Sequence, residues 1–141
     1  MVFRVRSFEV RTGGWRTEVS VTNDTSVSFR LGDTPDTPQR RYGLMLFSTG
    51  DHGELDRRNA DGSLPEIRHA DRYVPLLPDV LGPGEAWAGE LSAPGPLVAG
   101  SWVRVVFGPL VPVGETPKSL RDLGVSGPLI WITDHAYELR R

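Results

Sequence analysis

The chain has 141 residues, of which 38% are hydrophobic and 24% are charged, and its formal net charge is −2 at pH 7. This composition is typical of a soluble globular protein with a single domain, here residues 1–141, and no apolar run reaches the roughly 20 residues that a membrane span needs. The charge balance is far from the basic one typical of nucleic-acid binding, and the lack of cysteine excludes disulfides, thiolate nucleophiles and cysteine-bound metals.

Sixteen glycines and twelve prolines are spread along the chain between short stretches rich in Val, Phe, Trp and Thr. This pattern is typical of strands joined by turns. The first strand is expected over Phe3–Val10, and the second over residues 15–23. In the second strand apolar and polar residues alternate strictly, which predicts one buried face. The residues of that face are Trp15, Thr17, Val19 and Val21.

Later stretches of the chain show strand patterns of two kinds. Residues 42–47 are apolar on both faces, as expected of a central strand. Residues 101–108 give the clearest strand signal, although Arg104 interrupts an otherwise apolar pattern. Between them, a short edge segment is expected from Arg72. The remaining strands are predicted at residues 27–31, 85–91 and 129–133, the last with a continuation toward Leu139.

Residues 48–72 are polar, charged and rich in turn residues, with no sustained period. Irregular segments of this length are often functional, so it is the first place to look for a site. The alternative is a solvated excursion that contains a short helix or hairpin. A helix is expected instead near residues 117–123, because Thr116 is a good N-cap, Pro117 suits the first helical position and Gly124 follows the end.

These elements predict an all-β fold. The expected architecture is an immunoglobulin-like antiparallel β-sandwich of seven or eight strands, with one short helix near residues 117–123. A small closed barrel is the competing architecture.

Two motifs resemble the immunoglobulin-like accessory sandwiches of bacteria, a group that includes many domains of unknown function. The first is a strand that ends in Val-Thr-Asn. The second is a Leu-x-Pro-Gly-Glu turn, followed by a strand with a glycine and then a proline. The resemblance covers about residues 15–108 and implies a sandwich fold and a non-catalytic binding or interaction module. The matching positions are Val21, Thr22, Asn23, Leu81, Pro83, Gly84, Glu85, Gly89 and Pro94.

The tryptophans and the paired arginines are candidate binding residues. A tryptophan ring can fill the space between two sheets, but it also serves in interfaces. An exposed ring would give a platform for a carbohydrate or another small molecule. Arginine pairs would form a surface for an anionic ligand if they cluster, and otherwise they are solvated side chains balanced by acids. The candidates are Trp87, Trp102, Trp131, Arg57 and Arg58, with Trp15 as a further possible platform.

The three histidines each stand beside or near an aspartate. If residues 48–72 folded over the end of the last strand, these side chains would converge into a metal site of imidazoles and carboxylates, as in a metal-binding protein or a metal-dependent hydrolase. No periodicity brings His52 and His69 together, so exposed loop histidines are the other interpretation. The residues concerned are His52, His69, His135, Asp51 and Asp134, with Asp71 beside His69.

No catalytic motif is present in the sequence. The G-x-S-x-G elbow and the two glycine-rich phosphate loops are missing. We therefore predict no catalytic residues and no cofactor. The expected function is a protein-interaction or accessory module, which binds another protein or itself through a sheet edge or residues 48–72. Nucleic acid and membranes are not expected partners. The opening residues, MVFRVRSFEV, lack the apolar run of a secretory signal, so we expect a cytoplasmic protein.

Overall fold

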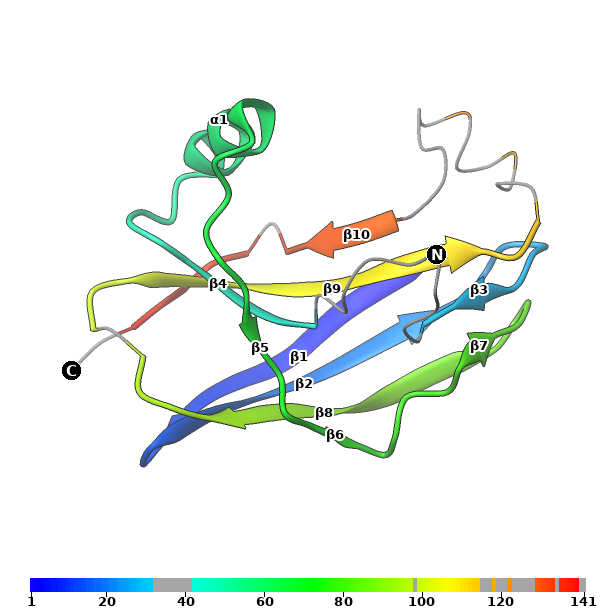
Figure 1. Ribbon diagram of the computed structural model, residues 1–141, viewed down its shortest axis with the longest axis horizontal. Coiled ribbons are helices and arrows are strands. Elements are labelled where there is room, and N and C mark those ends of the chain that lie inside the picture. The colour runs from blue at the N-terminus through cyan, green and yellow to red at the C-terminus, as the bar shows by residue number, and fades with distance from the viewer. Residues whose placement is uncertain are drawn as a thin grey trace.

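The computed structural model describes residues 1–31, 42–97, 99–114, 129–133 and 135–139, together with Lys118 and Asp122. Two antiparallel sheets face each other across a shared core (Figure 1). The prediction of an all-β sandwich is therefore confirmed. The helix expected near residues 117–123 falls outside the described residues, apart from Lys118 and Asp122.

The first sheet has four strands in the order β1-β2-β8-β6. β1 and β2 form a hairpin, and β2 then pairs with β8 over its whole length, from Gly14 opposite Pro94 to Thr22 opposite Ala86. A β-bulge between Val5 and Ser7 interrupts the register of the hairpin. The strands are β1 (Val2–Arg11), β2 (Gly14–Thr22), β8 (Ala86–Pro94) and β6 (Arg72–Val74).

The second sheet is built around one long strand, β9 (Trp102–Pro112). Its neighbours are short, and several of them pair with only part of β9. Because different short strands pair with different parts of β9, the described strands are more numerous than the seven or eight expected. For example, β4 pairs with residues 102–106 of β9, whereas β3 pairs with residues 111–112. The other strands are β3 (Phe29–Arg30), β4 (Gly43–Phe47), β5 (Arg68–His69), β7 (Val80–Leu81), β10 (Leu129–Ile132) and β11 (Tyr137–Glu138).

The main core lies between the two sheets and follows the alternation in the sequence. Trp15, Thr17, Val19 and Val21 of β2 are all buried, as predicted. Opposite them, β9 contributes alternate side chains, and aromatic rings from both sheets meet around Phe107, whose ring centroid lies 4.6 Å from that of Tyr42. The core residues that β8 and β9 supply are Trp87, Leu91, Val103, Val105, Phe107 and Leu110.

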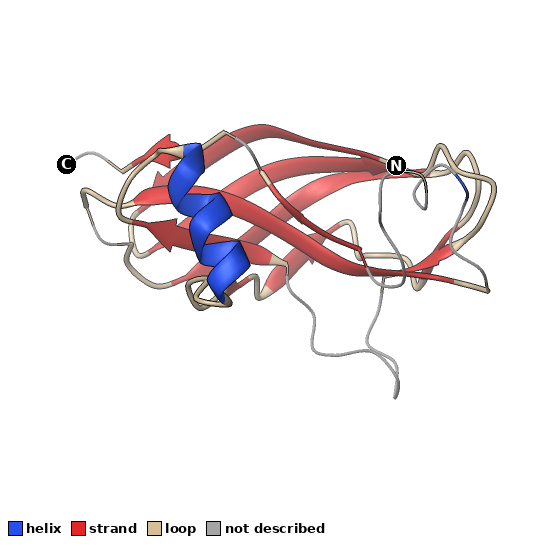
Figure 2. Ribbon diagram, turned by 90° about the horizontal axis from the view of Figure 1, so that it is seen from above, coloured by secondary structure: helices blue, strands red, loops and turns tan. Residues whose placement is uncertain are grey.

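A second, smaller core lies on the other side of the second sheet, under the helix α1 (His52–Asp61). Figure 2 shows this helix lying across the strands. Leu55 of the helix packs with Met45 and Phe47 of β4 and with Val106 of β9. β4 and β9 are thus buried on both faces, which explains their largely apolar sequences. The helix also confirms that residues 48–72 contain a short helix.

The two motifs that carry the sequence resemblance meet in space at Asn23. This side chain is fully buried. Its Nδ2 donates to the carbonyl oxygens of Val27 (2.7 Å) and Leu81 (2.9 Å), and its Oδ1 accepts from the backbone and the hydroxyl of Thr25. The backbone of Asn23 also bonds to the turn at Gly84 and Glu85. Asn23 therefore joins the end of β2 to the turn that leads into β8.

Candidate functional site

The outer face of the first sheet is the candidate site, and we call it the open face. α1 packs on the outer face of the second sheet, on the opposite side of the sandwich (Figure 1). On the open face, in contrast, Arg4, Arg6, Ala88 and Arg72 are all exposed. Its members are Arg4, Arg6, Glu9 and Arg11 of β1, Arg16, Glu18, Ser20 and Thr22 of β2, Ala86, Ala88, Glu90 and Ser92 of β8, and Arg72 and Val74 of β6.

One row across the strands brings opposite charges together, whereas in the next row Glu18 and Glu90 lie opposite each other. Glu9, Arg16, Ser92 and Arg72 lie directly opposite one another on four successive strands. Five arginines on the open face stand against three glutamates, an excess of two positive charges, whereas the whole chain has a formal net charge of −2. The open face is therefore more positive than the protein as a whole.

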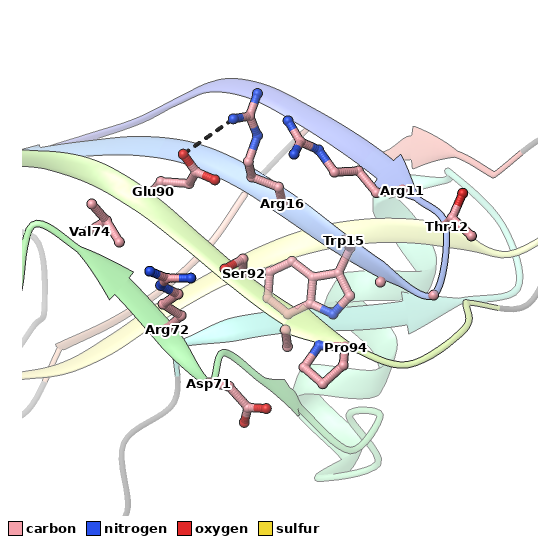
Figure 3. Close-up of a pocket in the computed structure, with 13 residues that line it drawn as sticks. Arg11, Thr12, Trp15, Arg16, Asp71, Arg72, Val74, Glu90, Ser92 and Pro94 are labelled. Carbon is pink, nitrogen blue, oxygen red and sulfur yellow. Dashed lines mark hydrogen bonds and ion pairs between the residues drawn. The ribbon is translucent and has the colours of Figure 1, made fainter.

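A hollow of about 620 Å³ lies at the end of the open face next to the β1–β2 turn. Arg11, Trp15, Arg16, Ser92 and Arg72 are among its lining residues (Figure 3). The Trp15 side chain is largely buried, with 3% of its surface exposed, so its indole forms part of a rigid wall. Asp71 also borders the hollow, but Figure 3 shows its carboxylate turned away from the arginines.

Ion pairs hold two of these arginines in place. Arg16 contacts Glu9 at 3.1 Å and Glu90 at 3.3 Å, and Arg11 contacts Glu9 at 3.3 Å. All four side chains are at least partly exposed, so each pair adds little to stability. These ion pairs fix the guanidinium groups of Arg11 and Arg16, and the charges of the arginines and glutamates neutralise one another.

A second hollow, of about 280 Å³, lies further along the open face between Arg6 of β1 and Val74 of β6. Ala88, Gly89 and Glu18 also line it. A side chain at Gly89 could not be accommodated, because its Cβ would lie 2.6 Å from the Trp87 ring and 2.7 Å from the Val74 carbonyl oxygen. Glycine is therefore required where β8 comes this close to the Trp87 ring and to the backbone at Val74.

Three arginines of the open face stand apart from the ion pairs described above. In the part of the chain that the structure describes, Arg4, Arg6 and Arg72 make no ion pair and no side-chain hydrogen bond. All three are exposed. Their guanidinium groups are available to an external ligand.

A third hollow, of about 380 Å³, lies beside α1 and is lined by Met45, Leu55, Leu64 and Ile132, among others. At its rim, His52 Nδ1 lies 3.1 Å from Asp56 Oδ2, one helical turn away, and both side chains are exposed. Four of its eight lining residues belong to the second core, and three others are on α1. We therefore assign this crevice to the packing of α1.

None of the three tryptophans proposed as binding residues is fully exposed. Trp87 is 5% exposed and packs in the main core beside Phe107. Trp102 is half-buried against the second core, and Trp131 is half-buried with its ring 6.3 Å from that of Phe3. None of these three rings offers an open stacking platform.

Arg57 and Arg58 lie on α1, away from the open face. The Arg58 Nε donates to the carbonyl oxygen of Ser63 (2.7 Å), and its guanidinium lies 5.7 Å from the centre of the Phe47 ring. Arg58 therefore helps to hold the end of the helix. Arg57 is exposed beside it.

The proposed metal ligands are dispersed over the structure. His52 begins α1, His69 lies in β5 and the His135 ring packs against Tyr137 at 4.6 Å. Asp51 serves as the N-cap of α1 and accepts from the backbone of Gly53 (3.0 Å). Asp134 lies outside the described residues. Among the residues that the structure describes, no three histidines and acids come close enough to hold a metal ion.

Two charged side chains are buried near the start of α1. Arg104 is 1% exposed, and its guanidinium donates to the carbonyl oxygen of Thr133 (2.7 Å). The same guanidinium lies over the Phe47 ring, 5.6 Å from the ring centre. Glu54 is 7% exposed and accepts from the hydroxyls of Thr49 (2.6 Å) and Ser48 (3.0 Å). The hydrogen bond from Thr49, helped by those from Ser48, lowers the pKa of Glu54 below its ordinary value of 4.5, although burial acts in the opposite direction.

No known protein family, curated protein or solved structure matches this chain. Within the described ranges, none of the helical segments has the length and apolar character to cross a bilayer. The candidate site therefore depends on the geometry of the open face. Sequence reasoning missed this site, although the outward positions of the alternating strand β2, which carry Arg16 and Glu18, were a signal for it.

Proposed function

We propose that this protein is a non-catalytic binding module that recognises another protein through the open face. One observation carries the proposal. α1 covers the outer face of one sheet, while the other sheet presents a hollowed face with arginines that no described residue pairs. The resemblance to immunoglobulin-like accessory sandwiches agrees with such a role, and the immunoglobulin-like character and a cytoplasmic location remain part of the proposal.

The proposal favours the face of the sheet over its edge. β1 is a long edge strand, but the bulge between Val5 and Ser7 breaks its register, and Arg4, Arg6 and Arg11 project from it. Bulges and charged side chains are the usual means by which proteins prevent another strand from pairing with an edge. Residues 48–72 are also less suitable, because α1 is used to cover the second core.

The test compares two matched substitutions in a protein-capture experiment. Ala88→Gln places a larger neutral side chain in the hollow between Arg6 and Val74. Ala60→Gln makes the same change at an exposed position of α1, on the other side of the sandwich. Tagged wild-type protein and both variants are incubated with native lysate, and the bound proteins are quantified by mass spectrometry.

We expect at least one protein to bind the wild type and the Ala60→Gln variant equally and to be lost from the Ala88→Gln variant. If that protein is the chain itself, the partner is a second copy. Light scattering will then show a dimer for the wild type and the Ala60→Gln variant, and a monomer for the Ala88→Gln variant. A bound set that is identical for all three baits would contradict the proposal.

A further inference from the structure

We infer that the partner presents an acidic segment, which crosses the open face from Arg4 and Arg6 on β1 to Arg72 on β6. The inference rests on the proposed function and adds the chemistry of the partner. It depends on which charges of the open face are already engaged and which are available.

One group of charges, at the end of the open face next to the β1–β2 turn, is electrically balanced. Glu9 and Glu90 contact Arg16, and Glu9 also contacts Arg11, so that these two arginines and two glutamates neutralise one another. An incoming carboxylate would have to compete with the protein's own acids for these guanidinium groups. The positive excess of the open face therefore lies with the arginines outside this network.

Arg4, Arg6 and Arg72 are the arginines outside it. Each is exposed, and within the described residues none of them has an ion-pair partner. A guanidinium presents a planar pair of donors that matches a carboxylate in two parallel hydrogen bonds. Carboxylates are accordingly the protein groups that complement these three side chains.

Ser92 adds a neutral donor next to Arg72. It lies between Arg16 and Arg72 in the row across the strands, and it lines the hollow of about 620 Å³ (Figure 3). Its hydroxyl has no protein partner in the described part of the chain. A carboxylate bound by Arg72 can also accept from this hydroxyl.

The spacing of the available arginines suits an extended segment. Arg6 is on β1 and Arg72 is on β6, three strand-to-strand steps apart, which is about 14 Å across the strands. Arg6 is also displaced along β1 from Glu9, the residue in the row of Arg72. An extended segment of eight residues is about 27 Å long. Such a segment can therefore place separate carboxylates at both arginines, with its backbone over the hollow between Arg6 and Val74.

The same face argues against a nucleic-acid partner. Glu9, Glu18 and Glu90 lie among the arginines, and the excess is two charges. Nucleic-acid binding draws its affinity from many phosphate contacts at once, for which this surface lacks the charge. An acidic protein segment, with separated carboxylates, fits the mixed pattern better.

The probe for the test is a fluorescein-labelled octapeptide of glutamate, and its neutral counterpart is the same peptide of glutamine. Binding is measured by fluorescence anisotropy at low ionic strength, where exposed charges are least screened. The variants are Arg6→Gln, Arg72→Gln, their combination and Glu18→Gln. Arg57→Gln on α1 is the matched control, because Arg57 is an exposed arginine away from the open face.

We expect the glutamate peptide to bind the wild type and the glutamine peptide to bind much more weakly. Arg6→Gln and Arg72→Gln should each weaken binding about threefold, and the double variant about tenfold, as for partly exposed ion pairs. Glu18→Gln should strengthen binding, because it removes a like charge from the path. Arg57→Gln should leave the affinity unchanged.

Equal binding of the two peptides, or an equal loss with Arg57→Gln and Arg72→Gln, would overturn the inference. The proposed function is tested separately by the Ala88 and Ala60 baits. Suppose that the Ala88→Gln and Ala60→Gln baits capture different proteins, but the glutamate peptide binds no better than the glutamine peptide. The open face then remains the recognition surface, and the acidic partner is rejected. If the baits do not differ, the proposed function itself is rejected.

Discussion

Single buried polar residues hold the loops of this sandwich in place. Asn23 satisfies donors and acceptors from two distant segments at once, because its amide reaches the carbonyl oxygens of Val27 and Leu81. Such a residue cannot be replaced by an apolar one without leaving buried groups unpaired. The same holds for Glu54, which accepts from Ser48 and Thr49.

Asn23→Ala should lower the free energy of unfolding by about 2–4 kcal/mol, because it leaves several buried groups without a hydrogen bond. The measurement is urea denaturation followed by tryptophan fluorescence. Asn59→Ala is the control, since Asn59 is exposed on α1, and a change below about 0.5 kcal/mol is expected there. Equal stability of Asn23→Ala and the wild type would contradict the role given to Asn23.

Glu54→Gln should destabilise the protein at pH 7, and the difference from the wild type should shrink in acid. The pKa of Glu54 is lowered in the folded state, mainly by the hydrogen bond from Thr49. Its contribution is therefore present above the ordinary pKa of 4.5 and is lost as the pH falls through the lower folded value. Urea midpoints measured from about pH 3 to about pH 7 test this.

Glu66→Gln is the matched control for that series, since Glu66 is exposed after α1. A difference between Glu54→Gln and the wild type that stays constant across the series would show that the charge of Glu54 contributes nothing.

Among the elements, α1 covers the second core. Leu55 is 7% exposed and is the helix's apolar contribution to the cluster with Met45, Phe47 and Val106. Leu55→Ala should lower the free energy of unfolding by about 2–4 kcal/mol, through lost burial and the cavity that remains. Leu76→Ala provides the control, because Leu76 is 82% exposed, and a change below about 0.5 kcal/mol is expected. Chemical denaturation of both variants checks the prediction, and equal losses would contradict it.

The long strands were predictable from the sequence, whereas for residues 48–72 it offered a short helix or a hairpin without bounds. The alternation in β2 and the apolar runs of β4 and β9 identify their buried faces directly. In α1, however, only Leu55 and Glu54 are buried, so no apolar stripe of helical period exists. Its signals are at the ends, where Asp51 caps the first turn and Gly62 adopts a left-handed conformation with φ 69°.

The candidate site could not be predicted from the sequence, because its residues come from distant parts of the chain. Arg6 and Arg72 are 66 positions apart in the chain, and they share a face only because β6 pairs with β8 in the first sheet. The tryptophans were predicted as binding residues, but large rings also fill the core of a small sandwich. Pairing between distant strands, which sets the composition of the open face, cannot be read from local patterns.

At the scale of the whole molecule, the two outer faces of the sandwich are built differently. The second sheet is closed by α1 over an apolar cluster, so that face contributes to stability. The first sheet keeps its outer face hollowed and charged, which suits recognition. Binding to this face should depend on charge and therefore weaken as salt is added.

The most direct test is two-dimensional NMR of the isotope-labelled protein during titration with the glutamate octapeptide. Changes in the chemical shifts of the backbone amides then show which residues the peptide contacts. We predict shifts at Arg6, Ala88, Ser92 and Arg72, on β1, β8 and β6, and none at Leu55 or Ala60 on α1. Shifts that gather on α1, or that are spread evenly over both faces, would contradict the claim that the open face is the recognition surface.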